Sequence, residues 1–323
     1  MKRIAVILLA LIVAGCSQVQ LSEEELCEKT WRYDLACALK HTLSGSEISK
    51  IKNLADKLRG ENCAESAWNI LAWVDENIQY DVQKASLPQP VIEVVGRDVK
   101  VVAGEARMYQ TPAETVMLGR GICGDYAILT AALLLAADCS AYVLNVSFAG
   151  EEQNHVTAAV KLDQLYVLDQ HLPPMDLGSY YRKWLRDGKT IERVEVYEVT
   201  PGKVAVVATM QRNDLERFDY AMTQADAENL ERKIESMLHD SFGLKVDERL
   251  KGKTLPHDYV SGEIWRLTVQ DYADYFTPAF ADEIAEHFYD MLVEDLDLKN
   301  ARAFNLEVAV QGDDVVLTLV VAR

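Results

Sequence analysis

A cysteine at the start of an apolar helix is the feature of this sequence with the clearest chemical meaning. The segment GRGICGDYAILTAALLLAADC, residues 119–139, places Cys123 directly after a glycine-rich turn and before a long apolar run. A thiolate at a helix N-terminus is stabilised by the helix dipole and by unpaired backbone N–H groups, which lower its pKa from about 8.5. The same N–H groups can hold the oxyanion that forms when a nucleophile attacks a carbonyl. Cys123 is therefore expected to be a nucleophile rather than a packing residue.

A nucleophilic thiol needs a base and a third group that orients the base, and the sequence supplies both in order. His155 opens the predicted strand HVTAAVKL, and Asp169 ends the predicted strand LYVLD. If these strands are neighbours in a sheet that lies against the Cys123 helix, His155 faces the thiol and Asp169 holds the other ring nitrogen. His171 is the alternative base, although its position in a loop before two prolines favours a structural or substrate contact. Asp125 is expected to serve the first turn of the helix, where its charge complements the dipole.

The apolar periodicity predicts the elements that must position these residues. A helix is expected over about 23–41, and a second helix follows and ends at Gly60. A further helix is capped by Thr111, and the remaining helices are expected over 64–80, 123–137, 227–242 and 280–296. Strands are expected at 91–95, 99–104, 141–149, 155–162, 165–169, 191–199 and 203–210, with a terminal hairpin at 304–322 that turns at Gly312-Asp313.

Three segments, taken in order, resemble the transglutaminase-like domain family, which is related to the papain-like cysteine peptidases. They are GRGICGDYAILTAALLLAADCSAYVL, NHVTAAV and LYVLDQ, preceded by WNILAWVDENIQYD, so that the resemblance runs from about residue 64 to 175. The resemblance implies an α+β fold in which the Cys123 helix packs on an antiparallel sheet. It also implies thiol acyl-transfer chemistry, since members of the family act as peptidases, amidases or protein cross-linkers. Some members have lost catalysis.

This chain departs from the family pattern at two places. Many members carry an aromatic residue after the histidine, where this chain has Val156-Thr157. The side chain that helps to hold the oxyanion precedes the cysteine in the family, and Tyr109 and Gln110 are both available for that role. The substrate class therefore stays open.

The N-terminus has the layout of a targeting segment. A short basic MKR is followed by the twelve apolar residues IAVILLALIVAG and then by Cys16. An apolar run of this length suits a signal-peptide core better than a membrane span. Its ending, VAGC, resembles the lipobox of prokaryotic lipoproteins, which implies cleavage before Cys16, lipidation of that residue and a membrane-anchored location outside the cytoplasm. An ordinary cleaved signal and an uncleaved anchor helix are the alternatives.

An odd number of cysteines remains once Cys16 is set aside. The five are Cys27, Cys37, Cys63, Cys123 and Cys139. Outside the cytoplasm, an odd set suggests one reactive thiol beside disulfides. If Cys123 is that thiol, the other four can pair in three ways, and their spacing does not choose among them. No cluster has zinc-ligand spacing, so we expect neither a metal nor another cofactor.

Charge and length limit the remaining possibilities. The chain has 323 residues and a formal charge of −18, with no basic stripe, which argues against nucleic-acid binding. We divide it into a signal peptide (1–15), an N-terminal helical segment (16–62), a transglutaminase-like catalytic domain (63–190) and a smaller C-terminal α+β domain (191–323).

The function expected from these observations is hydrolysis of a peptide or amide bond by a membrane-anchored thiol enzyme. The expected partners are a peptide or protein substrate, the membrane through the lipid, and a protein bound by the C-terminal domain. Two alternatives remain open. One is an inactive scaffold of the same fold that binds peptides or proteins, and the other is a protein cross-linking transglutaminase.

Overall fold

The computed structural model describes residues 21–323, except 89, 96, 104–107, 252–254, 295, 297 and 299. The expected signal segment and Cys16 lie outside the described residues. Among the residues that are described, no helix is both long enough and apolar enough to cross a bilayer.

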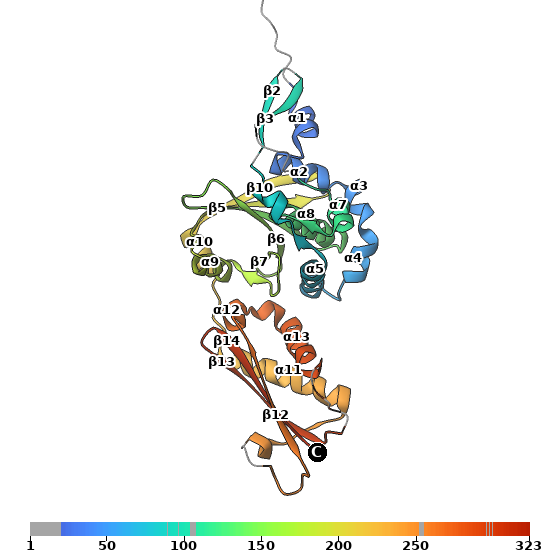
Figure 1. Ribbon diagram of the computed structural model, residues 1–323, viewed down its shortest axis with the longest axis vertical. Coiled ribbons are helices and arrows are strands. Elements are labelled where there is room, and N and C mark those ends of the chain that lie inside the picture. The colour runs from blue at the N-terminus through green and yellow to red at the C-terminus, as the bar shows by residue number, and fades with distance from the viewer. Residues whose placement is uncertain are drawn as a thin grey trace, which may run out of the picture.

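The N-terminal part is a group of short helices that pack on the central domain (Figure 1). They are α1 (Glu23–Thr30), α2 (Leu35–Thr42), α3 (Gly45–Lys50) and α4 (Lys52–Leu58). Ser22 and Glu25 form a capping box at the start of α1. The single helix predicted over 23–41 is instead two helices, because α1 ends at Thr30 and the Asp34 side chain caps a new helix by accepting from the backbone N–H of Cys37.

Helix α8 (Cys123–Ala136) is the centre of the domain, and all but one of its residues are buried. On one side it contacts the N-terminal helices and α5 (Cys63–Asn77), and on the other it contacts the sheet (Figure 1). The short elements β1 (Gln79–Tyr80), α6 (Val82–Ser86), β2 (Val91–Val95), β3 (Asp98–Ala103), α7 (Pro112–Leu118) and β4 (Arg120–Gly121) lie between α5 and α8 in the chain. The predicted cap of α7 by Thr111 is confirmed, with Glu114 completing the capping box.

The central sheet has six antiparallel strands in the order β10-β9-β5-β6-β7-β8. The strands are β5 (Ala141–Phe148), β6 (His155–Lys161), β7 (Leu165–Leu168), β8 (Met175–Asp176), β9 (Ile191–Thr200) and β10 (Lys203–Gln211). Apolar side chains of α8 cover one face, and α9 (Leu177–Arg186) packs on the other. The expected α+β class and the packing of the cysteine helix on an antiparallel sheet are confirmed.

The domain boundary predicted at residue 190 does not fit this sheet. Strand β9 pairs with β5 along its length, from Ala141 opposite Val199 to Phe148 opposite Ile191, and β10 follows β9 in a hairpin. Residues 191–211 therefore belong to the central domain. Their own residues indicate strands but not which sheet these strands join, because the pairing partner lies about fifty residues earlier in the chain.

The C-terminal domain begins after α10 (Arg212–Leu215) and consists of a four-stranded sheet with two long helices. Its elements are α11 (Gln224–Phe242), β11 (Lys245–Val246), β12 (Gly262–Val269), α12 (Tyr272–Tyr275), α13 (Ala281–Glu294), β13 (Ala303–Gln311) and β14 (Asp314–Ala322). The terminal hairpin turns at Gly312 as predicted, with a positive φ of 67°. Phe280 joins the two domains, because its ring packs against Tyr166 of β7 and Trp68 of α5.

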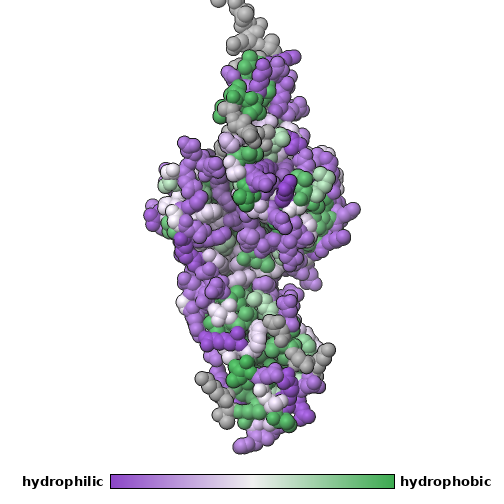
Figure 2. All heavy atoms as spheres, viewed as in Figure 1, coloured by the Kyte–Doolittle hydropathy of each residue, from purple (hydrophilic) through white to green (hydrophobic). Residues whose placement is uncertain are grey.

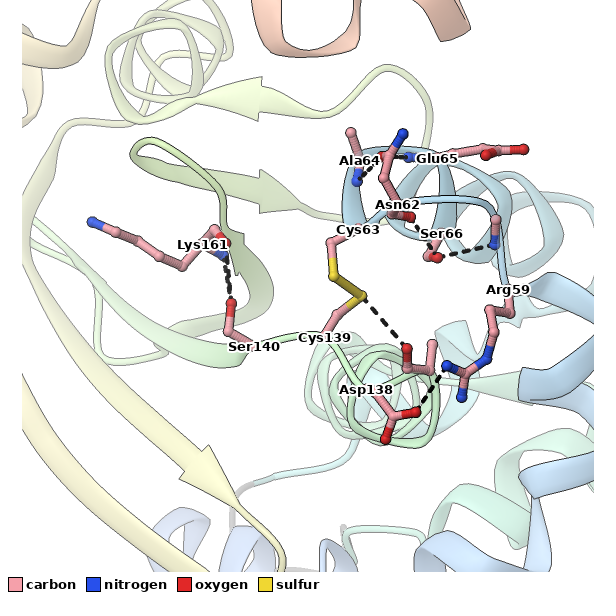
Figure 3. Close-up of a disulfide and its surroundings, with 12 residues drawn as sticks. Arg59, Asn62, Cys63, Ala64, Glu65, Ser66, Asp138, Cys139, Ser140 and Lys161 are labelled. Carbon is pink, nitrogen blue, oxygen red and sulfur yellow. Dashed lines mark hydrogen bonds and ion pairs between the residues drawn. A yellow bond between two sulfur atoms is a disulfide. The ribbon is translucent and has the colours of Figure 1, made fainter.

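Two disulfides settle the pairing that the sequence left open. Cys27 is bonded to Cys37 and joins α1 to α2. Cys63 is bonded to Cys139 and joins the first residue of α5 to the chain just after α8, where Figure 3 shows the bridge beside the Asn62 cap of α5. Cys123 is in neither disulfide.

Candidate active site

The local fold at Cys123 places its thiol at the first residue of a buried helix. Gly119 ends α7 in the left-handed conformation, with φ 61°, and the chain then passes through β4 into α8. Cys123 is the first helical residue and is 8% exposed. The backbone N–H groups at the start of a helix point out of its first turn and can face a ligand, although that of Asp125 already donates to the carbonyl oxygen of Ile122 at 2.8 Å. The expected position of Cys123 at the loop-to-helix junction is confirmed.

Asp125 has a larger structural role than complementing the helix dipole. Its fully buried carboxylate accepts a hydrogen bond from the backbone N–H of Ile122 at 2.9 Å and another from the backbone N–H of Gln110 at 2.9 Å. It also binds the ammonium group of Lys84 at 2.6 Å. Asp125 therefore fastens α6 and the segment before α7 to the residues that carry the cysteine.

His155 and Asp169 come together because their strands are neighbours. In the pairing of β6 with β7, Ala158 lies opposite Leu168, so the head of β6 lies beside the end of β7. The ring nitrogen Nε2 of His155 is 2.8 Å from Oδ1 of Asp169, and both side chains are largely buried. Because Nε2 binds Asp169, Nδ1 is the ring nitrogen left for a second partner.

The charges of this group shift the pKa values of His155 and Asp169 in opposite directions. Burial lowers the pKa of His155, but the charge and hydrogen bond of Asp169, aided by a hydrogen bond and charge from Cys123, raise it overall to about 10. Burial raises the pKa of Asp169, but the charge and hydrogen bond of His155, followed by those of Lys183, lower it overall to about 2. The protonated imidazole is thus the favoured form, next to a carboxylate and a thiol that can be a thiolate.

Helix α9 supplies residues to this group that the sequence analysis did not identify. The Trp184 ring lies edge-on to the His155 ring, with centroids 5.1 Å apart, and Lys183 places its ammonium 3.5 Å from Asp169. The helix could have been found from Leu177, Tyr180, Tyr181 and Trp184, which recur at the spacing of one helical face.

A pocket of about 110 Å³ opens beside the thiol. Its lining includes Cys123, Gly124, Tyr109, Asn154 and Val156. A Cβ atom on Gly124 would lie 2.5 Å from Cε1 of Tyr109, so the glycine is needed for the tyrosine ring to lie over the helix start. A larger hollow, of about 640 Å³, lies between α1, α2 and β10, and Cys123 does not line it.

The side chains of two other candidate residues bind partners other than the thiol. The Gln110 side chain accepts a hydrogen bond from the hydroxyl of Thr115, so of the two residues considered for the oxyanion, Tyr109 is the one that lines the pocket. His171 is 70% exposed and binds Asp75 of α5 at 2.6 Å. This contact favours the structural role expected for His171 over that of a base. Among the described residues, no group of His, Cys, Asp and Glu side chains is arranged to hold a metal ion.

Known proteins resemble this chain along its whole length. A family model for a transglutaminase-like domain matches residues 49–197, which crosses the domain limits that the sequence suggested at 63 and 190. A UPF0252 protein from Archaeoglobus fulgidus is 40% identical, covering 99% of this chain and 100% of that protein. A UPF0252 protein from Pyrococcus furiosus is 27% identical, covering 98% and 94%.

Among solved structures, a proposed protease from Parabacteroides distasonis covers 89% of this chain and 51% of that chain, with 10% identity and a TM-score of 0.33. The family assignment rests on the relatives that match in sequence. The chain belongs to the UPF0252 family and contains a transglutaminase-like domain.

Proposed function

We propose that the protein hydrolyses a peptide or amide bond with Cys123 as nucleophile, His155 as acid and base, and Asp169 as the group that orients His155. The observation that supports this proposal most directly is the buried His155–Asp169 pair, together with the contribution of Cys123 to the raised pKa of His155. A core cysteine kept only for packing does not require a histidine with a carboxylate partner beside it.

The reaction begins with a thiolate and an imidazolium, since Asp169 favours the protonated imidazole. The thiolate attacks the carbonyl carbon of the substrate, and the carbonyl electron pair moves to oxygen. The N–H groups at the start of α8 donate to this oxyanion, and Tyr109 lies at the same pocket. When the oxyanion collapses, the C–N bond breaks, the leaving nitrogen takes the proton of His155, and a thioester remains on Cys123.

Water resolves the thioester. Neutral His155 accepts a proton from the water as its oxygen attacks the thioester carbonyl. The C–S bond then breaks, which regenerates the thiolate and the imidazolium and releases the acid. Asp169 stays ionised throughout and stabilises the imidazolium in both halves of the reaction, because its pKa is lowered to about 2.

We also propose that the protein is held on the outer side of a membrane by its N-terminus, through a lipid on Cys16. The basic residues, the apolar run and the cysteine that follows it support this proposal. The two disulfides support an oxidising location. Mass analysis of the N-terminal peptide tests it. A peptide that begins at a lipid-modified Cys16 is expected, and one that begins at Met1 with no added mass contradicts the proposal.

The triad is tested by the reactivity of Cys123 itself. We would measure iodoacetamide alkylation from pH 4 to 9, counting only the peptide that contains Cys123 by mass spectrometry. The wild-type thiol should react at pH values well below about 8.5, the ordinary pKa of a thiol, and His155→Ala should lose most of the reactivity at these pH values. His171→Ala is the matched control, since His171 also binds a carboxylate but is exposed. Equal profiles for His155→Ala and the wild type would refute the triad.

A substrate screen separates hydrolysis from its two alternatives. Fluorogenic peptides offered with and without a primary amine distinguish release of an acid from formation of an amide to the amine. An activated thiol that forms no product with any peptide would favour the inactive scaffold.

A further inference from the structure

The β2–β3 hairpin carries apolar side chains that are exposed in the part of the chain that the structure describes. The pairing places Ile92 opposite Val101 and Val94 opposite Val99, so that these four side chains share one face. Val94 and Val101 are 45% and 39% exposed, whereas Ile92 and Val99 are half-buried. Three more valines of the hairpin, Val91, Val95 and Val102, are also exposed. Among the described residues, none of these seven side chains belongs to a packed apolar cluster.

A hairpin with two strands and no partner is only marginally stable in water. Contiguous exposed apolar side chains of this kind mark a surface that contacts a partner. Figure 2 shows hydrophobic residues at this end of the molecule and also on the C-terminal domain, on either side of a central body whose visible face is mostly hydrophilic. The four charged residues of the hairpin are Glu93, Arg97, Asp98 and Lys100, so its net charge is zero although the chain carries −18.

The hairpin lies at the end of the molecule where the described chain begins. Figure 1 shows α1 beside β2 and β3, and the C-terminal domain at the opposite end. Arg97, in the hairpin turn, is close enough to Glu25 of α1 for its charge to help lower the pKa of that carboxyl. The residues that run from Cys16 to Ser22, where α1 is capped, can span at most about 20 Å even when fully extended. A bilayer that holds Cys16 or the apolar run before it is therefore within reach of the hairpin.

We propose that the apolar face of the β2–β3 hairpin, formed by Ile92, Val94, Val99 and Val101, docks on the lipid surface to which the N-terminus is anchored. This inference rests on the proposed anchoring and not on the chemistry of Cys123. A lipid surface fits the hairpin because it buries branched apolar side chains, needs no complementary charge, and lies on the side where the chain would be tethered. Pro90 and Tyr109, which flank the hairpin in the chain, both line the Cys123 pocket. Docking would thus hold that pocket near the membrane, where a membrane-associated polypeptide could reach it.

An environment-sensitive label tests the docking in the full chain. Val94→Cys is made in a Cys123→Ser background, labelled with a nitrobenzoxadiazole group, and bound to phosphatidylcholine vesicles. The control is Val246→Cys, because Val246 has the same exposed fraction of 45% and lies in β11 of the C-terminal domain. The background chain without an added cysteine gives the signal from any label on Cys16, which is subtracted.

The expected result is a blue shift of the label at Val94 and its quenching by nitroxide-bearing lipids, while the label at Val246 keeps water-like emission. A chain that floats with the vesicles but keeps a water-like label at Val94 overturns the docking alone. A chain that does not float with the vesicles overturns the docking together with the anchoring, and leaves the alkylation result for Cys123 unaffected. A blue shift that needs no vesicles and grows with protein concentration assigns the face to a second copy of the chain and also overturns the proposal.

Discussion

Replacing Asp169 with Asn tests whether the charge of Asp169, rather than its hydrogen bond, sets the protonation of His155. An asparagine amide oxygen can still accept the bond that now joins His155 Nε2 to Oδ1 at 2.8 Å, but it carries no charge. The rise in the pKa of His155 from 6.5 to about 10 corresponds to about 5 kcal/mol in favour of the imidazolium, at about 1.4 kcal/mol per pH unit. Asp169 supplies the larger part of this stabilisation, ahead of Cys123.

Without that charge, burial dominates and lowers the pKa of His155, so the imidazole is neutral and Cys123 keeps its proton at neutral pH. We expect alkylation of Cys123 near pH 6 to slow by roughly a hundredfold, since losing even about 3 kcal/mol of ion-pair stabilisation is a factor of that size. Asp75→Asn is the matched control, because it removes the charge from the exposed His171 pair, where the contact is 2.6 Å. An Asp169→Asn profile that overlays the wild type between pH 4 and 9 would refute the reasoning.

The same variant should change how stability depends on pH. The raised pKa of His155 makes a contribution that is complete below about 6.5 and is lost as the pH rises through about 10. The lowered pKa of Asp169 makes a contribution that is present above 3.8 and is lost as the pH falls through about 2. The free energy of unfolding of the wild type, measured in urea, should therefore fall as the pH rises through the alkaline window and as it falls through the acid window. In Asp169→Asn this free energy should depend less on pH in both windows. Equal slopes in the variant and the wild type would contradict these pKa shifts.

Three further changes test other parts of the site. Gly124→Ala should lower hydrolysis and leave alkylation of the thiol largely intact, because a Cβ there meets a side chain at 2.5 Å and must displace it from the pocket; unchanged turnover would contradict this. Cys63→Ser combined with Cys139→Ser removes a cross-link over 76 residues. This should lower the free energy of unfolding in urea by about 4 kcal/mol. An unchanged urea midpoint would be inconsistent with this disulfide. Asp125→Asn leaves the ammonium of Lys84 without its counter-charge and should lower the free energy of unfolding by about 3–5 kcal/mol. Adding Lys84→Met should restore part of that loss.

The sequence was sufficient for the residues whose roles depend on local structure. Cys123 could be placed because glycines and an apolar run define where α8 begins, and His155 and Asp169 because each lies at the end of a short apolar strand. The contact between His155 and Asp169 also followed, since sequential strands are commonly neighbours in a sheet. Each of these predictions needed no information from distant parts of the chain.

Features that depend on distant partners could not be predicted in the same way. Strands β9 and β10 looked like the start of a new domain because nothing in their own residues states that β5 is their neighbour. The pairing of Cys63 with Cys139 requires α5 and α8 to be packed first. The membership of Trp184 in the site likewise depends on how α9 folds back over the sheet.

Asp125 and Asp169 illustrate why burial and partner, rather than residue type, decide what an aspartate does in this protein. Both carboxylates are buried, and both lie beside apolar residues in the chain. Asp125 is surrounded by backbone N–H donors and an ammonium, so its contacts fix the position of the residues around the cysteine. Asp169 faces an imidazole that can gain or lose a proton, so in the proposed mechanism its charge controls the reactivity of the thiol. If this distinction holds, Asp125→Asn should mainly lower stability and Asp169→Asn should mainly change the pH profile of Cys123.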